Sequence, residues 1–274
     1  MKKKSFVTLS LVLLSLVLLS ACGVFQEVEA PSATLEAIPL ETQAAGVATT
    51  APVEPTAAPE VATEPAAEEP TAALATEEAT TVPPTEEPTA TPTPAGVAQV
   101  FTIDSAASQV RFEIDEDLRG ALNTVVGTTD QVAGQLSVNL ADLSQTQVGV
   151  IQINARTLVT DNDFRNRAIN NEILDTGQFE FITFTPTAVE GLPASATVGE
   201  TITFTLVGDL TIRDTTLPAT FTVEATAVSE TQLTGTATTV VNRTDYDLQI
   251  PSVPSVANVE EEVELYIDFT ANAS

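Results

Sequence analysis

The residue types that most often carry catalysis are scarce in this chain. It has no histidine and a single cysteine, Cys22. Histidine is the most frequent general base and cysteine a strong nucleophile, so two common routes to catalysis are missing. Carboxylates are plentiful, but no spacing singles out a pair for acid–base work, and no glycine-rich phosphate loop is present. The sequence therefore predicts a protein that is not an enzyme.

Two acidic runs offer the oxygen ligands that a hard cation such as calcium prefers. The run Asp161-Asn162-Asp163 lacks the glycine and the distant glutamate of a complete calcium loop, and Glu260-Glu261-Glu262 directly precedes a strand pattern. We expect the first run to be a solvated turn or helix cap and the second an exposed turn, so no metal site and no cofactor are predicted.

Cys22 stands at the end of a segment typical of secretion. Lys2-Lys3-Lys4 is followed by an apolar stretch from Phe6 to Leu19 and by Ser20-Ala21. The stretch is short for a membrane span, which needs about 20 residues. The alternatives are a plain signal peptide with a buried cysteine and an uncleaved anchor helix.

A cysteine placed directly after small residues resembles the lipobox of bacterial lipoproteins. The resemblance implies that residues 1–21 are a signal peptide, that cleavage precedes Cys22 and that Cys22 carries acyl chains such as palmitate. Two or three such chains hold a protein firmly on a membrane. We therefore expect an extracytoplasmic, membrane-anchored lipoprotein, at the cell surface or in the periplasm.

Residues 22–97 have the composition of a disordered linker. Twelve of the 17 prolines precede residue 98, and no Lys or Arg lies between Cys22 and Gln99. Alanine, threonine, proline and glutamate in loose repeats bury too little apolar surface to offset the entropy of ordering. We predict a stalk of about 75 residues that lifts a domain off the membrane, with Thr-Pro clusters as candidate glycosylation sites.

Residues 98–274 read as one acidic all-β domain. They carry 25 acidic residues and 7 arginines, a balance that repels nucleic acid. Valine, isoleucine, threonine and phenylalanine alternate with polar residues at period two, which predicts about eight strands. The strands are expected near residues 110–114, 132–140, 148–155, 179–184, 202–212, 217–228, 232–241 and 263–271. Residues 161–174 instead have helical spacing, with Asp161 or Asn162 as the cap.

Segments in order along this domain resemble the YceI family of lipid-binding domains. They are Phe101-Thr102-Ile103-Asp104 with Ser108, Val110 and Phe112; Thr160, Asn162 and Arg165; Ile169, Leu174 and Asp175; Phe179, Ile182, Thr183 and Phe184; Gly208-Asp209-Leu210-Thr211-Ile212 with Thr216, Pro218 and Phe221; Asn242-Arg243-Thr244-Asp245-Tyr246; and Val263 with Leu265. The resemblance implies an eight-stranded antiparallel lipocalin-like barrel with one short helical segment. It also implies an apolar tunnel that takes a polyisoprenoid, a quinone tail or a similar amphiphilic lipid.

Inward-facing apolar residues are the candidate lipid contacts. We predict Phe112, Ile114, Leu136, Val138, Phe181, Phe184, Phe204, Leu206, Leu210 and Phe221. The alternative is that these side chains fill a closed core, as they do in many small barrels.

Several positions depart from the family pattern. The usual His-Ser pair is Ala107-Ser108 here, a second usual histidine is Glu116, and the usual Gly-x-Phe is Gly127-Thr128-Thr129. The usual glycine after the Asn-Arg motif is Asp247. The scaffold residues remain while polar residues at the expected cavity mouth differ, so the departures bear on the ligand more than on the fold.

Arg165, Arg243 and Asp245 have two interpretations. A buried arginine needs paired acceptors, so Arg243 and Asp245 would form a structural lock at one end of the barrel. Alternatively, Arg165 or Arg243 would meet the polar head of the bound lipid. For the whole protein, lipid binding or carriage is predicted, and the alternative is a packed, non-catalytic surface scaffold that recruits a protein or cations.

Overall fold

The computed structural model describes residues 27–32, 35–40 and 96–274, which belong to one compact unit. The predicted signal peptide, Cys22 and most of the predicted linker lie outside the described residues. Within the described part, no helix has both the length and the apolar character needed to cross a membrane.

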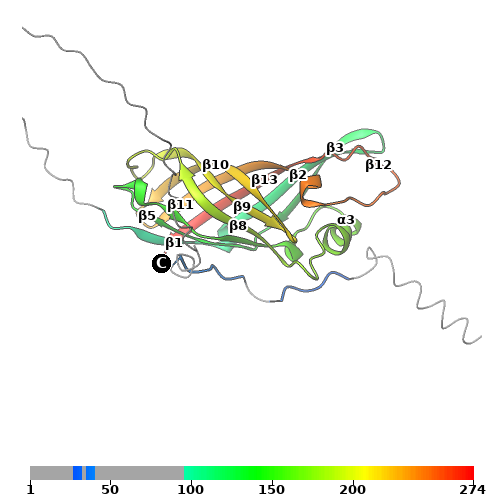
Figure 1. The fold of residues 1–274 in the computed structure, drawn as a ribbon, viewed down its shortest axis with the longest axis horizontal. Helices are drawn as coiled ribbons and strands as arrows, with labels where there is room; N and C mark the ends of the chain where they lie inside the picture. The colour runs from blue at the N-terminus through cyan, green and yellow to red at the C-terminus, as the bar shows by residue number, and fades with distance from the viewer. Residues whose placement is uncertain (1–26, 33–34, 41–95) are drawn as a thin grey trace, which may run out of the picture. The chain divides into compact units, whose positions relative to one another are not determined.

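The domain is built almost entirely from antiparallel strands (Figure 1). The strands are β1 (Gln99–Ile103), β2 (Gln109–Leu118), β3 (Ala121–Thr129), β4 (Val132–Ala133), β5 (Gln135–Val138), β6 (Gln147–Val148), β7 (Ile151–Asn154), β8 (Phe181–Glu190), β9 (Thr201–Ile212), β10 (Thr215–Ser229), β11 (Gln232–Asn242), β12 (Val256–Ala257) and β13 (Glu262–Ala273). Short helical turns are η2 (Ser105–Ala107), η3 (Leu143–Gln145), η4 (Ala155–Thr157), η5 (Ile169–Ile173) and η6 (Arg243–Tyr246), and the described residues also form the α-helix α3 (Asp163–Ala168).

These strands form one sheet that curls into a half-barrel (Figure 1). The order is β4-β7-β8-β9-β10-β11-β13-β1-β5-β6, and β2 pairs with β13, β3 and β12. The predicted all-β antiparallel fold is confirmed. β3 is the long strand that the sequence did not predict, because its apolar residues Leu122, Val125 and Val126 do not alternate with polar ones.

Strict alternation explains why β10 has one inward and one outward face. Ala219, Phe221 and Val223 are buried, whereas Thr220 and Thr222 between them are exposed. Successive side chains of a strand point to opposite faces, so a period-two pattern places every apolar residue of this stretch in the core.

The predicted helical segment is present but is divided in two. The Asn162 side chain accepts hydrogen bonds from the backbone N–H groups of Phe164 (2.9 Å) and Arg165 (3.2 Å), which caps α3. The predicted cap at Asn162 is therefore confirmed. After Ala168 the backbone continues as a π-helical turn, η5, and Leu174 ends it. Together α3 and η5 place Ile169 and Ile173 toward the interior.

Inward phenylalanine rings lie close to glycines on adjacent strands. A Cβ atom on the glycine would lie less than 3 Å from the ring in each of three pairs, which are Gly127 with Phe112, Gly208 with Phe184, and Gly235 with Phe269. At Gly127 a larger residue would push the Phe112 ring away, and at Gly208 and Gly235 it would also meet the backbone carbonyl of Thr185 or Glu224 at 2.4 Å. The glycines therefore let large rings and neighbouring backbone approach closely at these points of the wall.

Part of the predicted linker contacts the barrel. Residues 27–32 and 35–40, drawn in blue in Figure 1, run along its outside without regular secondary structure over nearly their whole length. Ser32 donates hydrogen bonds to Glu180, and the Leu40 backbone N–H donates to Gln135 Oε1 at 3.3 Å. These two segments of the predicted linker 22–97 therefore have partners about a hundred or more residues away in sequence, and the linker as a whole stays a prediction.

Candidate functional site

Three cavities lie inside the curled sheet, and apolar side chains dominate their walls. The central cavity has a volume of about 70 Å³, and every residue that lines it is aliphatic or aromatic. The large cavity has a volume of about 170 Å³ and lies under α3 and η5. The small cavity, of about 60 Å³, lies toward the other end, against η3 and the loop before β9.

The inward stripe of β13 gives the order of the cavities along the barrel. Val263 and Leu265 line the large cavity, Ile267 the central one, and Phe269 both the central and the small one. These residues alternate with Glu264, Tyr266 and Asp268, which belong to the outer face. The three cavities therefore form one apolar series along the barrel.

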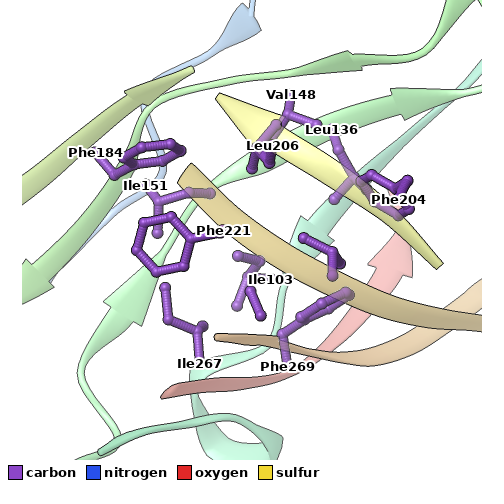
Figure 2. Close-up of a pocket in the computed structure, with 12 residues that line it drawn as sticks. Ile103, Leu136, Val148, Ile151, Phe184, Phe204, Leu206, Phe221, Ile267 and Phe269 are labelled. Carbon is purple, nitrogen blue, oxygen red and sulfur yellow. The ribbon is translucent and has the colours of Figure 1, made fainter. Parts of the chain in front are cut away.

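Figure 2 shows the central cavity with its aromatic and aliphatic lining. The rings of Phe184 and Phe221 meet edge to face, with centroids 4.8 Å apart and planes at 66°. On β8, Ile182 lines the large cavity and Phe184 the central one. On β9, Leu210 lies between the residues that line those two cavities. Phe184, Leu210 and Phe221 are each 2% exposed and form a packed partition between the large and central cavities.

Of the three cavities, only the large one has arginine side chains in its lining. The lining includes Glu116, Arg165 and Arg243. Arg165 Nη2 lies 3.1 Å from Glu116 Oε1, and Arg165 Nη1 lies 2.5 Å from Asp161 Oδ1. Glu116 is 6% exposed and also accepts a hydrogen bond from Asn123 Nδ2 at 3.1 Å. The end of the series under α3 thus carries the cationic groups, the central cavity is apolar, and the small cavity has Thr146, Glu200 and Thr226 in its lining.

Arg243 does not form the predicted lock with Asp245. Its guanidinium donates to three backbone carbonyls, which belong to Glu260 (2.9 Å), Leu248 (3.1 Å) and Val259 (3.4 Å). Among the described residues Arg243 has no ion pair, and Asp245 is exposed.

The Asp245 carboxylate acts on a neighbouring tyrosine instead. Burial raises the pKa of the Tyr246 phenol, and the charge of Asp245 raises it further. Arg243 therefore still has a structural role, but its partners are backbone carbonyls and not the Asp245 carboxylate. The reason is that η6 turns the Arg243 side chain toward the loops that lead into β12 and β13.

Eight of the ten predicted lipid contacts line a cavity. They are Phe112 and Ile114 in the large cavity, Phe184, Leu206 and Phe221 in the central one, Leu136 and Phe204 in both the central and the small one, and Val138 in the small one. Leu210 is buried in the partition and lines none of the three. Contact of these residues with a lipid stays a prediction.

Phe181 is a correction. It lies three residues from Phe184, and a regular strand cannot turn both to the same face. Since Ile182 and Phe184 line cavities, Phe181 belongs to the outer face of β8.

Sequence reasoning missed the cavity residues of β13, namely Val263, Leu265, Ile267 and Phe269. The signal was present, because these residues alternate with polar ones without a break. It also missed the buried ion pair between Arg156 Nη1 and Glu180 Oε2, which are 3.2 Å apart. These two residues are distant from each other in the sequence.

The geometry defines a class of protein, a half-barrel with an apolar interior that is suited to hold a ligand inside. Comparison with known proteins agrees. Residues 101–271 match the model of the YceI-like domain. This match spans more than half of the chain, and the chain belongs to the YceI-like family.

Two solved structures share the fold. One is a polyisoprenoid binding domain from Saccharophagus degradans implicated in plant cell wall breakdown, with a TM-score of 0.51, 16% identity, and coverage of 64% of this chain and 99% of that chain. The other is Burkholderia cenocepacia BcnA, with a TM-score of 0.50, 17% identity, and coverage of 62% and 99%. No curated protein sequence matches the chain.

Proposed function

We propose that this protein binds a polyisoprenoid or a similar amphiphilic lipid inside the half-barrel, with the apolar chain in the cavity series. The observation that carries the proposal is the central cavity, whose lining is entirely apolar and which lies between two further cavities lined mainly by apolar residues. Apolar cavities do not attract water and accept apolar ligands. The similar fold of a polyisoprenoid binding domain supports the same ligand class.

The polar groups give the ligand a direction. The large cavity holds Glu116, Arg165 and Arg243, while the central cavity offers no polar side chain. A polar head group placed under α3 keeps its hydrogen bonds, and the apolar chain then points toward the partition and the central cavity. The reverse orientation would place the head group beside Glu200, Thr146 and Thr226 of the small cavity, whose lining offers no arginine to an anionic or carbonyl-bearing head group.

Burial of the chain supplies the affinity. Apolar surface removed from water contributes about 25 cal/mol per Å², or about 0.8 kcal/mol for each methylene group. No covalent step is part of this proposal, so the protein holds or carries its ligand unchanged.

The proposal includes the place of action. The segment that ends at Cys22 resembles a lipoprotein signal, so the lipid-binding domain acts outside the cytoplasm on an acylated anchor. A protein fixed at a membrane meets lipid at high local concentration, which suits a carrier or a store of a poorly soluble molecule.

The test is organic extraction and mass spectrometry of the purified Cys22→Ser chain after expression in a lipid-replete host. This substitution removes covalently attached acyl chains from the sample. A stoichiometric isoprenoid or similar long-chain lipid is the expected result. A barrel that is empty and also takes up no added quinone or prenol would refute the proposal and favour a packed scaffold that recruits a partner.

A further inference from the structure

The strongest unexplained feature is the docking of residues 27–32 and 35–40, here called the strap, on the outside of the barrel. Its main contact is the Glu180 carboxylate, which is 9% exposed. The Ser32 backbone N–H donates to Glu180 Oε1 at 2.8 Å, and the Ser32 hydroxyl donates to Oε2. Asn154 Nδ2 donates to the same carboxylate at 2.9 Å, so a buried acceptor is shared between barrel and strap.

Arg156 forms the other half of this docking site. Its side chain is 7% exposed and donates to the Thr176 carbonyl from Nε (2.7 Å) and to the Gly177 carbonyl from Nη2 (3.1 Å). The strap supplies two further partners, the Ala30 carbonyl at 3.1 Å from Nη1 and the Glu29 carboxylate at 3.4 Å from Nη2. A buried guanidinium needs such acceptors, so the strap adds to the hydrogen-bond and ion-pair partners that the barrel gives to Arg156.

The electrostatics agree with a built contact. Burial by itself raises the pKa of Glu180, but the hydrogen bonds from Ser32 and Asn154 and the charge of Arg156 leave this pKa below its usual value of 4.5. At the other end of the strap, Leu40 donates to Gln135 Oε1, and Leu35, Ala37 and Ile38 are partly buried. Both ends of the strap are therefore attached to the barrel.

The attachment limits the distance from the barrel to Cys22. Only seven residue steps separate Cys22 from Glu29, and an extended chain covers at most about 3.6 Å per residue, so the reach is about 25 Å. The Pro-rich stretch comes after the strap in the sequence, so it does not lie between Cys22 and the strap. It therefore does not set the distance between an anchor at Cys22 and the barrel, contrary to the predicted stalk.

The strap also selects which end of the barrel is held. Glu29 contacts Arg156 beside Thr176 and Gly177, which follow η5, the wall of the large cavity. Among the described residues, the exposed apolar side chains that are larger than valine, Leu122 on β3 (73% exposed) and Phe164 on α3 (64%), both lie at this end, together with Val159 (54%). Exposed apolar groups of this kind suit the interface of a zwitterionic bilayer.

We infer that the strap docks on the Arg156–Glu180 pair and holds the α3 end of the barrel within about 25 Å of Cys22, with Leu122, Val159 and Phe164 facing the bilayer. The orientation rests on the proposed lipid anchor, whereas the docking does not. The large cavity then lies next to the membrane, and a lipid can pass between the bilayer and the cavity without crossing water over the length of a stalk.

Docking is tested without lipid, by hydrogen exchange on the full chain carrying Cys22→Ser. The hydrogen bonds to a charged acceptor predict that strap amides exchange at least about tenfold more slowly than in an unstructured peptide. Ser32→Pro removes both hydrogen bonds to Glu180 and touches no core residue, so it abolishes the protection of the Leu40 amide while the barrel amides stay protected. Glu27→Pro is the matched control at the exposed start of the strap and leaves the protection in place. Unprotected strap amides in the parent chain would overturn the inference.

Orientation is tested with the acylated protein in phosphatidylcholine vesicles that contain a quencher lipid. Single labels replace Phe164 at the α3 end or Val198 in the loop before β9 at the other end. The label at 164 is expected to be quenched and the label at 198 not, and Ser32→Pro should abolish the difference. Equal quenching of both labels in the parent would overturn the orientation. Failure of the protein to float with the vesicles would instead refute the anchor, and hydrogen exchange would still decide the docking.

Discussion

Phe184→Ala tests the partition between the large and central cavities. Phe184 is 2% exposed and packs edge to face on Phe221 at 4.8 Å. Truncation of a buried phenylalanine costs about 3–5 kcal/mol, to which the lost aromatic pair contributes about 0.5–1.5 kcal/mol. A loss of about 4 kcal/mol lowers the melting temperature of a domain of this size by about 8–16 °C.

The same substitution joins two cavities. Without the ring, the chain of a ligand that starts in the large cavity reaches the central one directly. Each further methylene that becomes buried stabilises the complex by about 0.8 kcal/mol, about fourfold in Kd. Phe184→Ala is therefore expected to steepen the dependence of affinity on prenol chain length while it lowers stability.

The assays are urea unfolding and titration with prenols of increasing length. Phe181→Ala is the matched control, since it removes the same ring three residues away on the outer face of β8 and should cost about 1 kcal/mol without changing the length dependence. A stability loss below about 1 kcal/mol for Phe184→Ala would refute the packed partition. An unchanged length dependence would refute its role as a barrier.

Three further predictions follow from single contacts. Gly127→Ala places a Cβ 2.1 Å from Phe112 Cε1, so the ring must move into the large cavity; calorimetry should show ligand affinity about tenfold weaker. Arg243→Ala removes three charge-assisted hydrogen bonds and should cost roughly 3 kcal/mol in urea unfolding, whereas Asp245→Ala should stay within about 0.5 kcal/mol; equal losses would restore the predicted ion pair. Folding lowers the pKa of Glu180, so the contribution of this carboxylate to stability is complete above pH 4.5 and declines as the pH falls below this value. The difference in unfolding free energy between the parent and Glu180→Gln should therefore shrink as the pH falls below 4.5. A difference that stays constant with pH would contradict this assignment.

The fold was predictable wherever alternation is strong. Residues 215–229 and 262–273 alternate almost without a break, and both form long strands. β3 was missed because Val125 and Val126 are adjacent, which obscures the face that the sheet buries. A local sequence pattern predicts a strand only if the two faces of that strand differ in polarity.

The site was predictable in its apolar part and much less in its polar part. The apolar cavity residues can be predicted because alternate residues of a strand point to the same face. The prediction for Phe181 was wrong because this alternation was not applied along β8. The acceptors of Arg243 are backbone carbonyls of distant loops, which no side-chain pattern reveals. The strap has the composition of the linker around it, and its partner Glu180 lies 148 residues from Ser32, so composition alone could not distinguish the docked segment from the rest.

The three glycines that lie beside phenylalanine rings differ in what a substitution would disturb. A methyl group on Gly127 would meet the Phe112 ring, whereas on Gly208 or Gly235 it would first meet the backbone carbonyl of Thr185 or Glu224 at 2.4 Å. The width of the large cavity, which Phe112 lines, can therefore be altered at Gly127 without moving a neighbouring strand. The other two glycines instead keep adjacent strands close together, so they belong to the architecture itself.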